Sequence, residues 1–303
     1  MKIFTNLLLA LTISLLPVAA QAQTAKQPVI TIVQGESPGG GGVGLQNQIM
    51  ESLRNHYEQV NIISVGNCDR AAQIYNSITD TPVAYMHSAE FQYLKDMGMH
   101  SCGIKVTADN IWMHAEMAQG FCTKGPGPVT FEDFKKSKTF ASILPQSLTD
   151  SMVDQINKEL KTDIKKIPYN GGSGLALTGI LNGEVDYAPI ALFRILDMIE
   201  DKRVACFAKY STGNAKLPGI REFIPEFTLG DYVFNVVGVA KNMNVDQLTF
   251  LRTSYQSQIK KGTPLRTNLN KIMWDLNEGS NTDLFAAYQH QESILKNAMK
   301  AAK

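Results

Sequence analysis

A run of glycines is the part of the chain best suited to chemistry on an anion. Gly39, Gly40, Gly41 and Gly42 follow a β-branched segment at 28–33 and precede apolar residues at helical spacing. Without Cβ atoms the backbone can approach an anion closely, and N–H groups ahead of a helix stabilise negative charge. The run lacks the G-K-[ST] ending of a P-loop, and no acidic residue follows at the offset of a dinucleotide site. We expect it to bind a small anion, and a flexible turn is the alternative.

Two later turns carry groups that suit the same kind of ligand. Each opens a predicted helix, so its hydroxyls either cap that helix or donate to a ligand, and a plain turn is the alternative for the glycines. The predicted binding residues there are Ser147, Leu148, Thr149, Gly171, Gly172 and Ser173. Further candidates lie at predicted strand ends or beside the turns, and they are His87, Ser88, Tyr169, Ala188 and Pro189. Tyr169 either faces the ligand or packs beneath it.

Motifs for catalysis or metal binding are not found in the sequence. The five histidines include no i,i+4 pair, and no H-E-x-x-H occurs. Gly172-Ser173-Gly174 lacks the register of a G-x-S-x-G nucleophile elbow. The twelve methionines are scattered and do not form a copper site. We predict a protein that is not an enzyme and that holds no cofactor and no metal, with a secreted hydrolase or isomerase as the alternative.

Length and composition indicate a globular chain of more than one lobe. The 303 residues are 44% hydrophobic and 19% charged, which excludes disordered and fibrous classes. A single core is near its size limit at this length, so two lobes are favoured. Lys and Arg total 29 against 28 acidic residues, and this balance argues against binding to nucleic acid.

The first 22 residues are typical of a cleaved secretory signal. Lys2 precedes an apolar stretch from Leu7 to Leu16, and the A-x-A pattern ends at Ala22. The apolar stretch is shorter than the ~20 residues that a membrane span needs. We therefore expect cleavage after Ala22 and an exported protein, periplasmic in a Gram-negative host.

Export would allow the four cysteines to form disulfides. Cys102 and Cys122 enclose a short strand-like stretch, and we predict a bridge between them worth about 3 kcal/mol, with four buried thiols as the alternative. Cys206 lies in an apolar strand pattern and is expected in the core. The cysteine spacing matches no zinc motif.

Alternating strand and helix patterns position these candidates. Strands at 28–33, 60–65 and 82–86 alternate with two helical patterns, which predicts a parallel sheet flanked by helices. A second series follows, with strands at 139–144, 164–167, 185–189 and 204–208 between helices. A long apolar strand at 232–240 is expected to return to the first lobe, and helices at 245–260, 265–276 and 284–302 complete the chain.

Three blocks of sequence resemble one family of exported binding proteins. Pro38-Gly-Gly-Gly41 after the first strand is similar to the P-x-G-G-G loop of tripartite tricarboxylate transporter solute-binding proteins, also called Bug or TctC-like proteins. Residues 168–186 resemble the family segment V-P-Y-K-G…A-L-T-x-L-L-G-G-x-V-D, and Leu217-Pro-Gly219 with the strand at 232–239 resembles its proline loop and aromatic strand. The blocks occur in the family's order from about Pro28 onward.

The resemblance implies an α/β, two-lobed type II periplasmic-binding-protein fold. Each lobe would be a mostly parallel sheet flanked by helices, with a cleft between the lobes. Residues 23–122 and 235–303 would form the first lobe and residues 123–234 the second. The implied function is capture of a small organic carboxylate, through backbone amides and hydroxyls, for delivery to the membrane permease of a tripartite transporter. The protein would be a monomer, and a sensory subunit that presents its ligand to a membrane receptor is the alternative.

Two departures from the family pattern bear on the ligand. Gly42 and Val43 stand where the family usually has Thr-Asp, so a carboxylate near the ligand is missing and an amino-acid ligand is disfavoured. The second loop, Leu144-Pro-Gln-Ser-Leu-Thr149, is bulkier than the family's glycine- and serine-rich loop. The changes at Gly42, Val43 and Gln146 therefore point to a ligand that differs from the usual ones.

Overall fold

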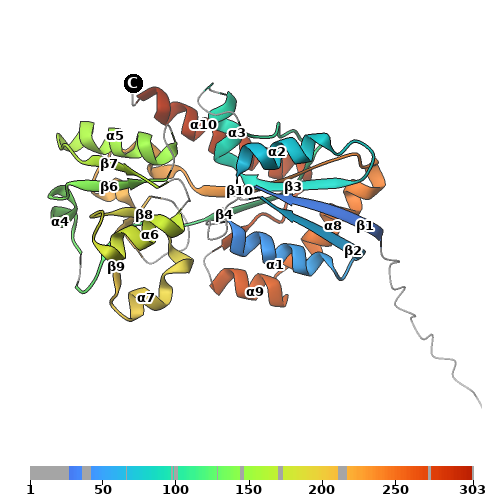
Figure 1. The fold of residues 1–303 in the computed structure, drawn as a ribbon, viewed down its shortest axis with the longest axis horizontal. Coiled ribbons are helices and arrows are strands. Elements are labelled where there is room, and N and C mark those ends of the chain that lie inside the picture. Colours follow the sequence, from blue (N-terminus) through green and yellow to red (C-terminus); the bar gives the residue numbers. More distant parts are fainter. Residues whose placement is uncertain are drawn as a thin grey trace, which may run out of the picture.

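The computed structural model shows two lobes side by side, connected by extended segments (Figure 1). It describes residues 27–35, 42–65, 67–96, 98, 102–127, 129–143, 147–169, 173–210, 217–271 and 274–301. The predicted signal sequence at 1–22 lies outside this part of the chain. None of the helices in the described ranges is both long enough and apolar enough to span a bilayer.

A six-stranded sheet forms the centre of the first lobe, in the order β11-β4-β10-β3-β1-β2. Its strands are β1 (Gln27–Gln34), β2 (Tyr57–Ser64), β3 (Val83–Ser88), β4 (Ile111–Met117), β10 (Phe234–Lys241) and β11 (Trp274–Leu276). β1 pairs in parallel with β2 and β3, whereas β10 is antiparallel to β3 and β4, and β11 is antiparallel to β4. The expectation of a mostly parallel sheet is therefore correct only for β1, β2 and β3. β10 enters the sheet from the second lobe, and this reverses its direction relative to β3.

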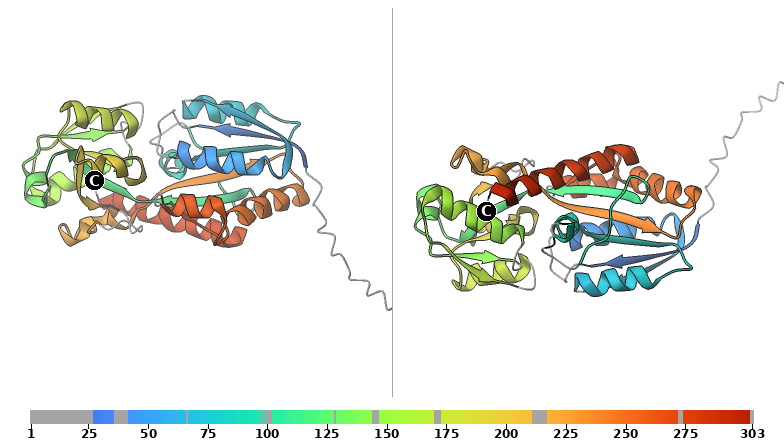
Figure 2. Two further views of the ribbon diagram at one scale, coloured as in Figure 1. Left: turned by 90° about the horizontal axis from the view of Figure 1, so that it is seen from below. Right: turned by 90° about the horizontal axis from the view of Figure 1, so that it is seen from above.

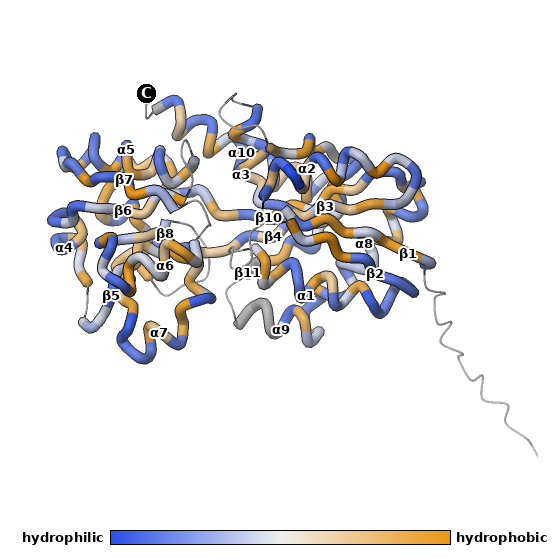
Figure 3. Tube along the Cα trace, viewed as in Figure 1, coloured by the Kyte–Doolittle hydropathy of each residue, from blue (hydrophilic) through white to orange (hydrophobic). Residues whose placement is uncertain are grey.

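Helices cover both faces of this sheet, as the views in Figure 2 show. They are α1 (Val43–Leu53), α2 (Cys68–Ser77), α3 (Ala89–Asp96), α8 (Val245–Ile259), α9 (Pro264–Lys271) and α10 (Asn281–Ala301). Alternate residues of β1 point to opposite faces. Ile32 belongs to the apolar cluster that contains Leu45 of α1 and Leu251 of α8, whereas Val33 belongs to the cluster that contains Tyr75 of α2. In Figure 3 apolar stretches run along β1 and β10 of the sheet.

The second lobe contains two smaller sheets. Its elements are α4 (Phe131–Lys135), α5 (Leu148–Leu160), α6 (Ser173–Asn182), α7 (Leu196–Glu200), β5 (Gln119–Lys124), β6 (Thr139–Ser142), β7 (Lys165–Pro168), β8 (Ala188–Ala191) and β9 (Val204–Lys209), with short 3-10 turns at Leu192–Arg194, Ile220–Glu222 and Thr228–Asp231. β5 lies between β8 and β9 and is antiparallel to both. β6 and β7 pair in parallel, and a parallel bridge joins Phe140 of β6 to Tyr187. The strand predicted at 185–189 begins later, at Ala188.

The last helix contacts both lobes. α10 packs on β4 and α3 of the first lobe, and its final turns also reach α5 of the second lobe. Ser151 of α5 donates its hydroxyl to the sulfur of Met299 in α10. Since β4 leads into β5 across a single residue, Ala118, the lobes are joined both by strands and by this helix.

The cysteine pairing differs from the predicted Cys102–Cys122 bridge, which is wrong. Cys68 at the start of α2 bonds to Cys102, and Cys122 in β5 bonds to Cys206 in β9. Cys122 and Cys206 are opposite each other in the antiparallel ladder, with Cα atoms 4.0 Å apart. Cys102 is held in the first lobe while Cys122 lies in the second, so the predicted pair is separated by the fold. Cys206 is a disulfide partner and not a core thiol.

A glycine in the central strand β10 lies against a buried tryptophan. A Cβ added to Gly238 would lie 2.5 Å from Cε2 of Trp112, whose indole N–H donates to the Val239 carbonyl at 3.3 Å. We therefore expect Gly238→Ala to lower the free energy of unfolding by about 1–3 kcal/mol through overpacking. Urea denaturation measures the change. Gly219→Ala is the matched control, because the nearest atom to its added Cβ is 3.9 Å away. Equal stability of the two variants would contradict the tight contact.

Candidate functional site

The carboxyl end of β3 carries two predicted site residues, His87 and Ser88. β3 is buried because it lies between β1 and β10. Nδ1 of His87 lies 2.8 Å from the Ser88 carbonyl oxygen, to which it can donate only if it carries the proton. Burial lowers the pKa of His87 to about 4, so the ring is neutral at neutral pH. Nε2 of His87 is then an acceptor, suited to a hydroxyl or amide donor and unsuited to a bare carboxylate.

Among the buried hydroxyl groups that have no hydrogen-bond partner within the described residues, three bear on ligand binding. They belong to Ser88 at the end of β3, Ser173 at the start of α6, and Tyr210 just after β9. Their residues are 3%, 5% and 0% exposed, respectively. A buried hydroxyl without a partner costs free energy, and such groups in native proteins commonly bond to a ligand or to water. These hydroxyls come from both lobes, and each can donate to an anion.

The start of α5 uses its predicted binding groups in local hydrogen bonds. The Ser147 and Thr149 hydroxyl oxygens lie 2.7 Å apart, and Thr149 Oγ1 accepts from the Ile143 N–H at 2.9 Å. Ser147 occupies the N-cap position without a side-chain capping bond. The Leu148 N–H donates to Oε1 of Glu90 at 2.8 Å. The first turn of α5 therefore already binds a carboxylate, which comes from the other lobe.

Glu90 is the site residue that the sequence interpretation missed. It lies in the first turn of α3, two residues after the end of β3. Burial raises the pKa of Glu90 to about 7, and the Leu148 N–H partly offsets that rise. The signal that could have identified it is an acidic residue directly after a fully buried strand, at the edge where site residues were expected.

The charge of Glu90 contributes to the raised pKa of two buried phenols, Tyr210 and Tyr232. Burial is the main cause that raises the pKa of Tyr210 and of Tyr232 well above the usual range, and the negative charge of Glu90 is the next. Both phenols are therefore neutral at physiological pH. The structure thus brings together Glu90, Leu148, Tyr210 and Tyr232 from α3, α5 and the segments that follow β9 and precede β10.

The other predicted residues of the second lobe have structural contacts of their own. Tyr169 packs on α6, where a Cβ added to Gly179 would lie 2.2 Å from its hydroxyl oxygen. That hydroxyl donates to Glu184 at 3.1 Å. Ala188 and Pro189 are buried and pair with Cys122 and Phe121 of β5. They open β8 and do not end a strand.

Most of the predicted glycines cannot be placed. Gly39, Gly40, Gly41, Gly171 and Gly172 lie outside the described residues. Gly42 is described, and its carbonyl accepts from the Gln46 N–H at 2.9 Å, which starts α1. The role of these loops in binding stays a prediction.

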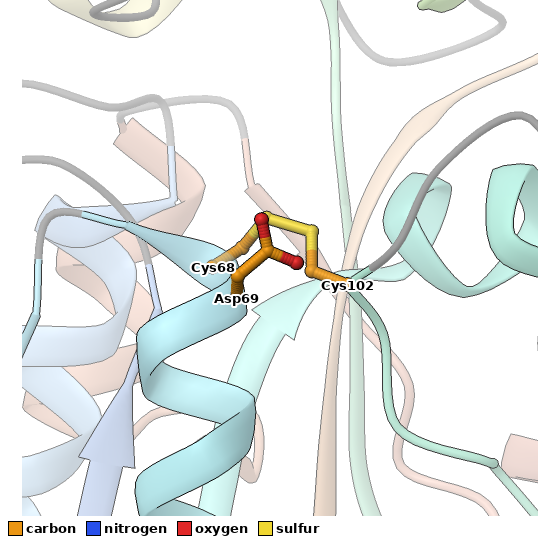
Figure 4. Close-up of side chains that lie close together, drawn as sticks. All are labelled: Cys68, Asp69 and Cys102. Carbon is orange, nitrogen blue, oxygen red and sulfur yellow. A yellow bond between two sulfur atoms is a disulfide. The ribbon is translucent and has the colours of Figure 1, made fainter.

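One group of potential metal ligands occurs in the described ranges, and its chemistry does not suit a metal. Cys68, Asp69 and Cys102 lie together at the start of α2, as Figure 4 shows. Both sulfur atoms form the disulfide, and a metal requires thiolates. A single carboxylate remains, which is a weak site alone.

The fold is that of the two-lobed periplasmic binding proteins. The chain is similar to a TctC solute-binding protein from Polaromonas, with a TM-score of 0.61 and 16% identity over 91% of this chain and 98% of that one. It is also similar to an R. palustris protein solved with adipate (TM-score 0.74, 17% identity, 92% and 98% covered) and to MatC from Rhodopseudomonas palustris with bound malate (TM-score 0.71, 13% identity, 91% and 99% covered).

These similarities establish the fold over nearly the whole length of the chain. No protein-family model matches the sequence, and no curated protein matches it. The three neighbours include a TctC protein, so the fold expected from the sequence resemblance is confirmed.

Proposed function

We propose that this protein is an exported solute-binding protein of the tripartite tricarboxylate transporter type, which binds a small organic carboxylate between its lobes and delivers it to a membrane permease. The observation that carries the proposal is the similarity in fold to two proteins solved with adipate and with malate. The sequence resemblance at Pro38–Gly41 and at 168–186 supports the same family.

The chemistry of the described residues supports anion binding. Unpartnered hydroxyls from both lobes, on Ser88, Ser173 and Tyr210, are available as donors. Hydroxyls and backbone N–H groups can stabilise a carboxylate without a cation. We propose that the glycine loops at 39–42 and 171–172 complete the site, and that the chain crosses between the lobes near residues 118 and 234, so the first crossing lies slightly before the boundary at 122 expected from the sequence.

The location follows from the same reasoning. Two disulfides suit an oxidising compartment, and we propose that cleavage after Ala22 releases the protein into the periplasm. The permease partner is proposed from the family resemblance. A binding protein needs no catalytic group, and we propose no reaction.

A panel of small carboxylates tests the proposal by thermal shift. A ligand at a hundred times its Kd adds about 2.7 kcal/mol of stability. For a chain of this size we expect that to raise Tm by roughly 5 °C. The corresponding primary amides, at equal ionic strength, are the control and should leave Tm unchanged. A panel of mono- and dicarboxylates that raises Tm no more than their amides do would contradict the proposal.

Two serine variants test whether carboxylate binding involves the hydroxyl at the end of β3. Ser88→Ala removes an unpartnered hydroxyl at the end of β3, and we expect it to weaken binding of the best carboxylate about tenfold, as for a lost hydrogen bond to a charged group. Ser137→Ala removes an unpartnered hydroxyl just after α4 and should leave affinity unchanged. Titration calorimetry distinguishes the two.

A further inference from the structure

The carboxylate of Glu90 connects the two lobes at the start of a long helix. Glu90 belongs to α3 in the first lobe, and its partner, the Leu148 N–H, is the first helical N–H of α5 in the second. The N-terminus of a helix of this length carries a partial positive charge that favours an anion. The carboxylate of Glu90 therefore occupies the N-terminus of α5, where a ligand between the lobes could otherwise place a carboxylate of its own.

We propose that Glu90 is a specificity-determining residue of the inter-lobe site, and that it makes the protein select ligands with one carboxylate over those with two. The inference rests on the proposed function. A second ligand carboxylate directed at α5 would compete with Glu90 for the Leu148 N–H and would meet a like charge. Displacing Glu90 would in turn leave a largely desolvated carboxylate without its donor, which is costly.

The groups around Glu90 favour a ligand of low charge. Unpartnered hydroxyls lie near it in sequence and in space: Ser88 precedes it by two residues, and Tyr210 interacts with its charge. These are neutral donors, sufficient for one carboxylate and uncharged polar groups.

The selectivity should depend on pH, because the charge of Glu90 changes near neutrality. Its pKa is raised to about 7 by burial, so the side chain is mostly ionised at pH 8 and mostly neutral at pH 6. Other titratable groups near it keep one charge state across this range. Tyr210 and Tyr232 stay neutral, and His87 stays neutral with a pKa of about 4. Discrimination against dicarboxylates should therefore be strongest at high pH.

Glu90→Gln tests the proposal, because an amide oxygen can still accept from the Leu148 N–H while the charge is lost. Titration calorimetry compares pentanoate with glutarate, hexanoate with adipate, and lactate with malate at pH 8 and pH 6. For each pair of acids that binds, the preference is the affinity for the monocarboxylate divided by the affinity for the dicarboxylate. At pH 8 we expect this ratio to be roughly tenfold higher for wild-type protein than for Glu90→Gln. At pH 6 the wild-type preference should approach that of the variant. Glu132→Gln, an exposed carboxylate in the first turn of α4, should behave as wild type.

The outcomes separate the two proposals. Equal preferences in wild type and Glu90→Gln at pH 8, with clear binding, overturn the role of Glu90 and leave the proposed function intact. If none of the six acids binds to either protein, the proposed function fails and this inference fails with it. Should Glu90→Gln not fold, the pH 8 and pH 6 comparison in wild type alone decides, because a pH-independent preference contradicts the inference.

Discussion

Replacing both Cys122 and Cys206 with alanine is expected to lower the free energy of unfolding by about 4–5 kcal/mol. The disulfide closes a loop with a sequence separation of 84 residues, and the entropy of loop closure in the unfolded chain grows with loop length. It also joins opposite positions of β5 and β9 in the middle of the second lobe. Urea denaturation under non-reducing conditions measures the loss.

The second disulfide provides a matched comparison. Cys68 and Cys102 have a sequence separation of 34, so the loop-entropy contribution should be about 0.8 kcal/mol smaller for the double alanine variant in the first lobe. Reduced wild-type protein should show a loss in the free energy of unfolding that combines the losses of the two variants. A Cys122→Ala/Cys206→Ala protein within about 1 kcal/mol of wild type would show that the bridge contributes little, which would contradict the loop argument.

Local sequence patterns predicted the elements that local forces determine. The strand predicted at 28–33 is observed as β1, and the helix predicted to begin at the turn with Ser147 is observed as α5. Thr130 and Asp133 form a capping box at the start of α4. These features depend on residues a few positions apart, so their signals lie within a short window of sequence.

Features that depend on distant partners were not predictable from such patterns. The cysteine pairing requires that β5 lie beside β9, and no spacing rule encodes that. The helix predicted at 265–276 is instead α9 followed by β11, because the free edge of β4 pairs with β11. Glu90 was missed for the same reason, since its partner Leu148 lies on another lobe.

The proposed site between the lobes shares one residue, Tyr210, with the aromatic core of the second lobe. Tyr210 interacts electrostatically with Glu90, and its ring also lies 5.6 Å from that of Phe121. The position of Tyr210 beside Glu90 therefore depends on the aromatic packing behind it. Stability of this core and geometry of the site should change together when the packing is disturbed.

Replacing Phe121 with alanine is expected to lower the free energy of unfolding by about 3–5 kcal/mol. Phe121 is fully buried in β5, and its ring centroid lies 5.6–6.3 Å from five other aromatic rings. Those rings belong to Phe134, Phe140, Phe207, Tyr210 and Phe227. Truncation removes buried apolar surface and leaves a cavity that rigid rings cannot readily fill. Urea denaturation measures the global loss.

Hydrogen exchange locates the damage, and a peripheral phenylalanine provides the control. Amides of β5, β8 and β9 should lose protection in Phe121→Ala while those of β1 and β3 keep it, because the two sheets share no strand. Phe223→Ala truncates a partly buried ring at the edge of the same aromatic cluster and should cost less than half as much. Equal losses in both variants, or equal loss of protection in both sheets, would contradict a core centred on Phe121. Because Tyr210 contacts that ring, Phe121→Ala should also weaken carboxylate binding, whereas Phe223→Ala should not.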